Sequence, residues 1–111
     1  MATLSFSETY NLFKLDEIRA VIEECLAKHG MPKIKTLPSE EGVILEASGG
    51  KLSMRIKLRQ ETIGNEGRGY FKGQPRVKIE FTASSHDEKN LAESIDRFRY
   101  CVIIRTSRGG G

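Results

Sequence analysis

The residues best suited to bind a charged ligand lie in the stretch KLSMRIKLRQ, residues 51–60. Apolar residues alternate here with polar ones, and the polar set includes Arg55, Lys57 and Arg59. Successive side chains of a β-strand point to opposite faces of a sheet, so the pattern predicts a strand with one apolar and one basic face. Such cations could bind the phosphates of a nucleic acid, or they could simply be hydrated.

Two further segments are expected to add to this basic face. In RVKIEF, residues 76–81, alternation places Arg76 and Lys78 opposite the apolar residues, and in KIKTL, residues 33–37, it places Lys33 and Lys35 together. Residues 51–82 hold 8 basic and 3 acidic side chains, although the net charge of the whole chain is only +3. This concentration of positive charge favours an anionic partner. Cross-strand pairing with Glu46, Glu61 and Glu80 is the alternative use of the same cations.

A glycine-rich segment, ETIGNEGRGYFKGQPR at residues 61–76, separates two of the expected strands. It carries four residues that could contact a nucleic acid: Arg68, Tyr70, Phe71 and Lys72. An aromatic ring in a loop can stack on an unpaired base while neighbouring cations hold phosphates. The two aromatic residues could instead anchor the loop to the core. We expect residues 61–75 to be the most mobile internal segment, because glycine raises the entropic cost of ordering.

Catalytic and metal-binding patterns are weak. His29 and His86 are the only histidines, and neither has a histidine or cysteine partner at the spacing of a metal site. Acidic pairs such as Glu23–Glu24 are adjacent in sequence, so their side chains do not converge on one face of a helix or strand. We therefore expect no enzyme activity, no metal and no cofactor.

The elements that must position the basic residues follow from periodicity. Residues 15–30 carry a helical apolar stripe, and a second stripe begins near a capping box formed by Ser85 and Glu88. Strands are expected at 33–37, 43–47, 51–60 and 76–81, with breaks at 38–42 and 48–50. Residues 100–106 could end the second helix or form a final strand, and residues 3–6 could form another.

The resulting order, α-β-β-β-β-α, predicts an α+β fold of two layers. A mostly antiparallel sheet of about four strands would carry both helices on one face and leave the other open. Residues 1–106 are expected to form one domain, and residues 107–111 a flexible glycine-rich tail. The expected core joins two sets of apolar residues, one from the strand at 51–60 and one from the helices: Leu52, Met54, Ile56 and Leu58 with Ile18, Ile22, Leu91, Ile95 and Phe98.

Targeting signals and cysteines point to the cytoplasm. The chain has no run of about 20 apolar residues, as a membrane span needs, and its start does not resemble a secretory signal. Cys25 and Cys101 are far apart in apolar patterns, so we expect both to be reduced and packed.

Two functions are consistent with these observations. The favoured one is a small nucleic-acid-binding protein that holds RNA or single-stranded DNA largely without regard to sequence. The alternative is a protein-interaction module whose basic face meets an acidic protein, or whose edge strand pairs with another chain, including a second copy in a homodimer. No membrane partner is expected.

Overall fold

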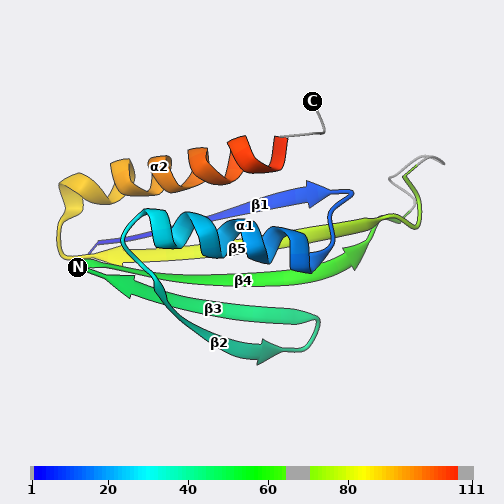
Figure 1. Ribbon diagram of the computed structural model, residues 1–111, viewed down its shortest axis with the longest axis horizontal. Helices are drawn as coiled ribbons and strands as arrows, with labels where there is room; N and C mark the ends of the chain where they lie inside the picture. Colours follow the sequence, from blue (N-terminus) through cyan, green and yellow to red (C-terminus); the bar gives the residue numbers. More distant parts are fainter. Residues whose placement is uncertain (1, 65–70, 108–111) are drawn as a thin grey trace.

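The computed structural model describes residues 2–64 and 71–107, which form five strands and two helices (Figure 1). In chain order the elements are β1 (Ala2–Asn11), α1 (Leu15–Lys28), β2 (Lys33–Ser39), β3 (Gly42–Gly49), β4 (Leu52–Thr62), β5 (Pro75–Ser85) and α2 (Glu88–Ser107). The expected α+β class with an antiparallel sheet is confirmed, with five strands in place of about four.

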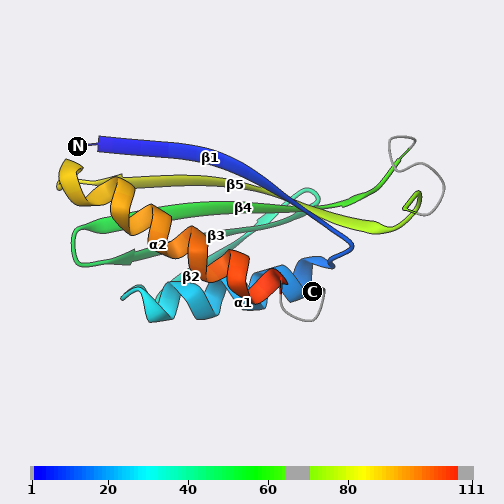
Figure 2. The ribbon, with the colours of Figure 1, turned by 90° about the horizontal axis from the view of Figure 1, so that it is seen from above.

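The sheet has the order β1-β5-β4-β3-β2, and every neighbouring pair is antiparallel. Both helices lie on one side of it, so the molecule has two layers (Figure 2). The β4–β5 hairpin extends beyond the helix layer at one end (Figure 1). This arrangement leaves one whole face of the sheet uncovered by helices, and we call it the open face.

Strand β1 is much longer than the segment at 3–6 that the sequence indicated. It pairs with β5 over its full length of 10 residues. On its helix-facing side, Phe6 stacks on Phe81 with ring centroids 4.5 Å apart, and the guanidinium of Arg99 lies 4.5 Å from the centre of the Phe6 ring. Arg99 also donates a hydrogen bond from Nε to Oε1 of Glu8 at 3.1 Å. Glu8 interrupts the apolar alternation, and Arg99 of α2 supplies the charge that balances it.

Residues 100–106 are helical, because α2 continues to Ser107. Val102 is 1% exposed and continues the buried stripe of Leu91, Ile95 and Phe98. The expected capping box is wrong: Asp87 caps the helix, accepting a hydrogen bond from the backbone N–H of Asn90 at 3.4 Å. The hydrogen bond from the Asn90 side chain is the main reason that the pKa of Asp87 is lowered.

Strand β2 runs through Pro38 to Ser39, so the break expected at Pro38 is also displaced. The strand tolerates a proline because it lies at the edge of the sheet, where one side of its backbone needs no partner. On the other side β2 pairs with β3 along its entire length.

The core lies between the sheet and the helices, largely as expected. Met54, Ile56 and Leu58 are at most 2% exposed, whereas Leu52, at the start of β4, is only partly buried. The helical members of the expected core are all buried: Ile18, Ile22, Leu91, Ile95 and Phe98. The apolar face of β4 was therefore assigned to the correct side of the sheet.

The two cysteines form a disulfide, which corrects the expectation that they are reduced. Cys25 of α1 and Cys101 of α2 have Cα atoms 6.0 Å apart and are linked across 76 residues of sequence. The antiparallel helices lie side by side, and Arg105 Nη1 lies 2.7 Å from Glu24 Oε1 along the same contact. Neither helix in the described part of the chain is long and apolar enough to cross a bilayer.

Candidate nucleic-acid interface

Seven basic side chains predicted for one surface do lie together on the open face. We call this set the basic face: Lys33 and Lys35 on β2, Arg55, Lys57 and Arg59 on β4, and Arg76 and Lys78 on β5. The register brings them together, because residues directly opposite on neighbouring strands share a face. Arg59 is opposite Lys78, for example, so two cations are neighbours across β4 and β5.

One row across the sheet shows how charge and hydroxyl groups alternate. Lys35 is opposite Glu46, Glu46 is opposite Arg55, and Arg55 is opposite Thr82. Arg55 Nε lies 3.8 Å from Oε2 of Glu46, and both side chains are well exposed to solvent. An ion pair this long and exposed is weak, so Arg55 can exchange Glu46 for another anion at little cost.

Two of the arginines are held more firmly, by Glu61. The Glu61 carboxylate lies 2.7 Å from Arg59 Nη2 and 2.9 Å from Arg76 Nη2, and only 18% of its side chain is exposed. Burial alone would raise the pKa of Glu61, but the hydrogen bonds from Arg76 and Arg59 and the charges of Lys78 and Arg59 together lower it. The Arg59 side chain is 37% exposed and is engaged in this cluster. We call Glu61, Arg59 and Arg76 the arginine clamp.

The four lysines of the basic face differ from these two arginines in their ion pairing. Lys33, Lys35, Lys57 and Lys78 are exposed, and none makes an ion pair with any residue in the described ranges. Lys57 is directly opposite Glu80 in the register, yet the two do not form one of the ion pairs of the described residues. The lysines, together with the weakly paired Arg55, are therefore the cations of this face best able to bind an external anion.

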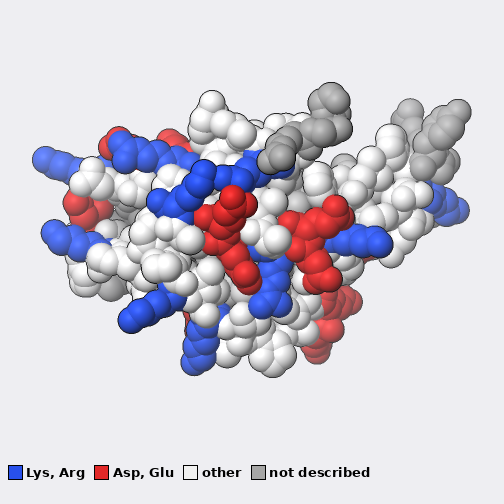
Figure 3. All heavy atoms as spheres, in the orientation of Figure 1, with Lys and Arg blue, Asp and Glu red and all other residues white. Residues whose placement is uncertain are grey.

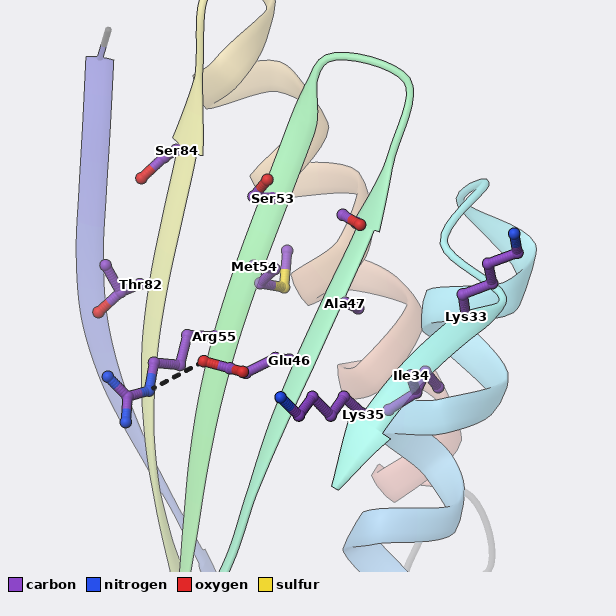
Figure 4. Close-up of a pocket in the computed structure, with 11 residues that line it drawn as sticks. Lys33, Ile34, Lys35, Glu46, Ala47, Ser53, Met54, Arg55, Thr82 and Ser84 are labelled. Carbon is purple, nitrogen blue, oxygen red and sulfur yellow. Dashed lines mark ion pairs between the residues drawn. The ribbon is translucent and has the colours of Figure 1, made fainter. Parts of the chain in front are cut away.

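A shallow hollow of about 690 Å³ lies on the open face between β2 and β5. In Figure 4, Lys35 extends over β3 from the β2 side, while Arg55 reaches from β4 toward β5. The hydroxyls of Ser53, Thr82 and Ser84 also line it. The hollow has cations on both sides, the Glu46 carboxylate between Lys35 and Arg55, and hydroxyls along β4 and β5 (Figure 4). A phosphate bound there would take the place of Glu46 in its long contact with Arg55.

Strand β1 contributes a polar row that the sequence-based prediction missed. Its residues on the open face are hydroxyl- or amide-bearing: Thr3, Ser5, Ser7, Thr9 and Asn11. Thr3 Oγ1 lies 3.3 Å from the hydroxyl of Ser84, and the Ser5 hydroxyl donates a hydrogen bond to Thr82 at 3.5 Å. The signal was the alternation of polar residues in TLSFSETYN, which Glu8 interrupts on the other face.

The predicted loop residues fall partly within the described chain. Phe71 is 49% exposed, which contradicts the alternative that it anchors the loop in the core, and Lys72 is exposed too. Arg68 and Tyr70 lie outside the described residues, as does the centre of the segment predicted to be mobile. Next to the strand ends, the Ile63 N–H donates to the Gln74 carbonyl oxygen at 2.8 Å. The hairpin ladder thus continues beyond Thr62 and Pro75.

The helix-covered side of the molecule differs in its charge pattern. Positive and negative side chains are interspersed there (Figure 3). Within the helices several are paired, as in Arg19 with Glu23, 2.9 Å apart, and Arg97 with Glu93. Several of the positive charges on this side are therefore balanced by neighbouring carboxylates.

The two histidines lie apart from each other, near the end of α1 and just before α2. The ring of His29 packs edge-on against Phe98 with centroids 6.4 Å apart, and His86 lies just before α2. In residues 2–64 and 71–107, no group of three or more His, Cys, Asp or Glu side chains is arranged to hold a metal ion.

Comparison of the chain with models of known protein families finds no match. Comparison with curated proteins finds no significant match either.

Proposed function

We propose that this protein binds single-stranded nucleic acid, RNA or DNA, through the phosphate backbone and with little dependence on base sequence. The observation that carries the proposal is a set of four exposed lysines that have no ion-pair partner among residues 2–64 and 71–107. They lie on the sheet face opposite to both helices. Strand spacing in a sheet is close to 5 Å, so cations on β2, β4 and β5 can follow a flexible polyanion across several phosphates.

The chemistry of the face favours backbone contacts over base reading. No aromatic side chain of the described strands lies among the basic residues, so a base would find no ring on the open face to stack on. Phe71, half-exposed beside Lys72 near the end of the β4–β5 hairpin, is the described residue best suited to stack on a base. Neither helix presents a basic surface that would suit the major groove of a duplex.

The test replaces three of the four free lysines and leaves the arginine clamp intact. Lys35, Lys57 and Lys78 are each changed to Gln, and the matched control changes Lys14, Lys28 and Lys89, which lie on or beside the helices, to Gln. Both variants lose the same net charge. Binding of labelled single-stranded RNA and DNA is measured by fluorescence anisotropy at several salt concentrations.

The open-face variant should bind oligonucleotides of any sequence more weakly. Its salt dependence should be flatter by about 2 in the slope of log K against log salt, from about 0.7 for each lost phosphate contact. The control should keep most of the affinity and the slope. Phe71→Ala should weaken binding by about 1–3 kcal/mol with the slope unchanged, because stacking releases no counterions.

Two results would contradict the proposal. One is no binding by the unchanged protein at low salt, and the other is an equal loss in both triple variants. In the first case an acidic protein becomes the better candidate partner for the basic face, and a pull-down from the native cell, analysed for RNA and for protein, would identify it.

A further inference from the structure

The two edges of the sheet differ in how well they are protected from pairing with another strand. β1 and β2 are the edge strands, and an edge strand presents unpaired backbone N–H and C=O groups. Proteins usually block such edges with proline, charged residues, a short strand or covering side chains. The edge of β2 is blocked in this way and the edge of β1 is not.

In an edge strand, every second residue bonds to the neighbouring strand and the residues between them turn their backbone groups to the free edge. One known hydrogen bond therefore shows which residues face each edge. The Leu12 N–H donates to the Pro75 carbonyl oxygen at 2.7 Å, and these residues continue the β1–β5 register. Hydrogen-bonded pairs alternate along an antiparallel ladder, so the even-numbered residues of β1 bond to β5. Its odd-numbered residues turn their backbone groups to the free edge: Thr3, Ser5, Ser7, Thr9 and Asn11.

The same argument applied to β2 gives a different edge. The Gln60 N–H donates to the Glu41 carbonyl oxygen at 2.9 Å, so the odd-numbered residues of β3 bond to β4 and its even-numbered residues bond to β2. Through the register, the odd-numbered residues of β2 bond to β3. Ile34, Thr36 and Pro38 then face the free edge, and Pro38 has no N–H to donate. The Arg19 side chain also places a charge beside this edge, because its Nη2 donates a hydrogen bond to the Thr36 hydroxyl at 3.0 Å. The edge of β2 is therefore poorly suited to pair with another strand.

The edge of β1 is long, uncharged and without proline. All five residues that open onto it are small hydroxyl residues or asparagine. The strand's one charged residue, Glu8, points to the helix side and pairs with Arg99 of α2. Apolar surface also lies beside this edge: Leu4 of β1 is 36% exposed, and Ile103, one helical turn after Arg99, is 48% exposed.

We propose that β1 is a dimerisation edge, where it pairs antiparallel with β1 of a second copy of this chain. A second copy fits because the two strands have equal length, and small hydroxyl- or amide-bearing residues meet one another with no like charges opposite. The register with Ser7 opposite its own counterpart engages all five open residues, since Ser5 then meets Thr9 and Thr3 meets Asn11. Each such pair can exchange two backbone hydrogen bonds.

The geometry of this pairing has a consequence for the open face. Two antiparallel edge strands in one continuous sheet are related by a two-fold axis perpendicular to the sheet. Both open faces therefore lie on the same side of the dimer. The proposal does not depend on nucleic-acid binding, but a dimer would present both basic faces to one polyanion.

The experiment measures the mass of the protein in solution by sedimentation over a concentration series up to about 500 micromolar. Ser7→Lys places two like charges opposite each other at the centre of the pairing. Ser7→Pro removes an N–H that faces the free edge and spares the ladder with β5. Thr36→Lys, at the edge of β2, is the matched control. Circular dichroism of each variant checks that the fold is retained.

The proposal predicts that the unchanged protein forms dimers. Either Ser7 substitution should raise the dissociation constant of the dimer at least about tenfold, and the Thr36→Lys control should leave it unchanged. Amide exchange provides a second measurement: the N–H groups of the five open residues should become protected as concentration rises, while those of Ile34 and Thr36 should not. A monomer at all concentrations would overturn the proposal, as would a dimer that folded Ser7→Lys protein forms equally well.

Discussion

At the scale of single residues, Glu61 decides which cations of the open face are available. Its carboxylate holds Arg59 and Arg76 at 2.7 and 2.9 Å, so these arginines stabilise the β4–β5 hairpin as well as contributing charge. Within the described part of the chain, the four lysines have no such partner. Two side chains that look equivalent in the sequence, Lys57 and Arg59, are therefore expected to serve different purposes.

Glu61→Gln should destabilise the protein by about 1 kcal/mol at neutral pH, because it removes the charge that pairs with both arginines. The pKa of Glu61 is lowered in the folded protein, so its contribution to stability is complete above the pKa of the unfolded chain, near 4.3, and is lost as the pH falls through the folded value. The difference between the two proteins should shrink in acid. Urea denaturation at several pH values measures it.

Glu41→Gln is the control for this prediction. Glu41 lies 3.7 Å from Arg59, and 62% of its side chain is exposed. Its removal should change the stability by less than about 0.5 kcal/mol at every pH, as is usual for an exposed surface group. An equal effect of the two substitutions would show that Glu61 does not clamp the hairpin.

At the scale of elements, β4 has two faces with different roles, and adjacent residues can test them separately. Ile56 is fully buried beneath the helices, and Lys57 is exposed on the open face. The strand is central in the sheet, with β3 on one side and β5 on the other. It therefore carries the core on one face and the candidate interface on the other.

Ile56→Ala should destabilise the protein by about 2–5 kcal/mol, because it removes buried methyl groups and leaves a cavity. Lys57→Ala should change stability by less than about 0.5 kcal/mol and weaken oligonucleotide binding instead. Chemical denaturation and anisotropy titration of both variants separate the two effects. A large stability loss from Lys57→Ala would mean that the open face is structural.

At the scale of the whole molecule, the disulfide between α1 and α2 joins parts of the chain that are distant in sequence. Residues 25 and 101 enclose β2 to β5 and most of α2 in one covalent loop. A link of this kind restricts the unfolded chain more than the folded one. The Glu24–Arg105 ion pair lies along the same helix contact.

Reduction of the disulfide should lower the free energy of unfolding by about 4 kcal/mol, from the entropy of closing a loop of 76 residues. The measurement is guanidinium denaturation with and without reductant, together with the intact mass after thiol alkylation. The variant Cys25→Ala with Cys101→Ala should show the reduced stability and no response to reductant. Two free thiols in the protein purified without reductant would contradict the link.

The sequence by itself determined the layer structure and the content of the basic face. Alternation in β4 and β5 assigns Ile56 and Lys57 to opposite faces because neighbouring side chains of any strand must point apart. The stripes of α1 and α2 likewise identify the helix faces that must be buried. These are properties of local geometry, so they can be read from a short window of sequence.

Only the tertiary structure decided the features that join distant residues. β1 extends past the charged Glu8 because Arg99, 91 residues away, compensates it, and residues 100–106 are helical because Val102 completes a stripe that packs on the sheet. Cys25 meets Cys101 because the helices lie side by side. Which strands form the edges, and which cations Glu61 neutralises, likewise depends on how strands pair in space, and no local pattern encodes that pairing.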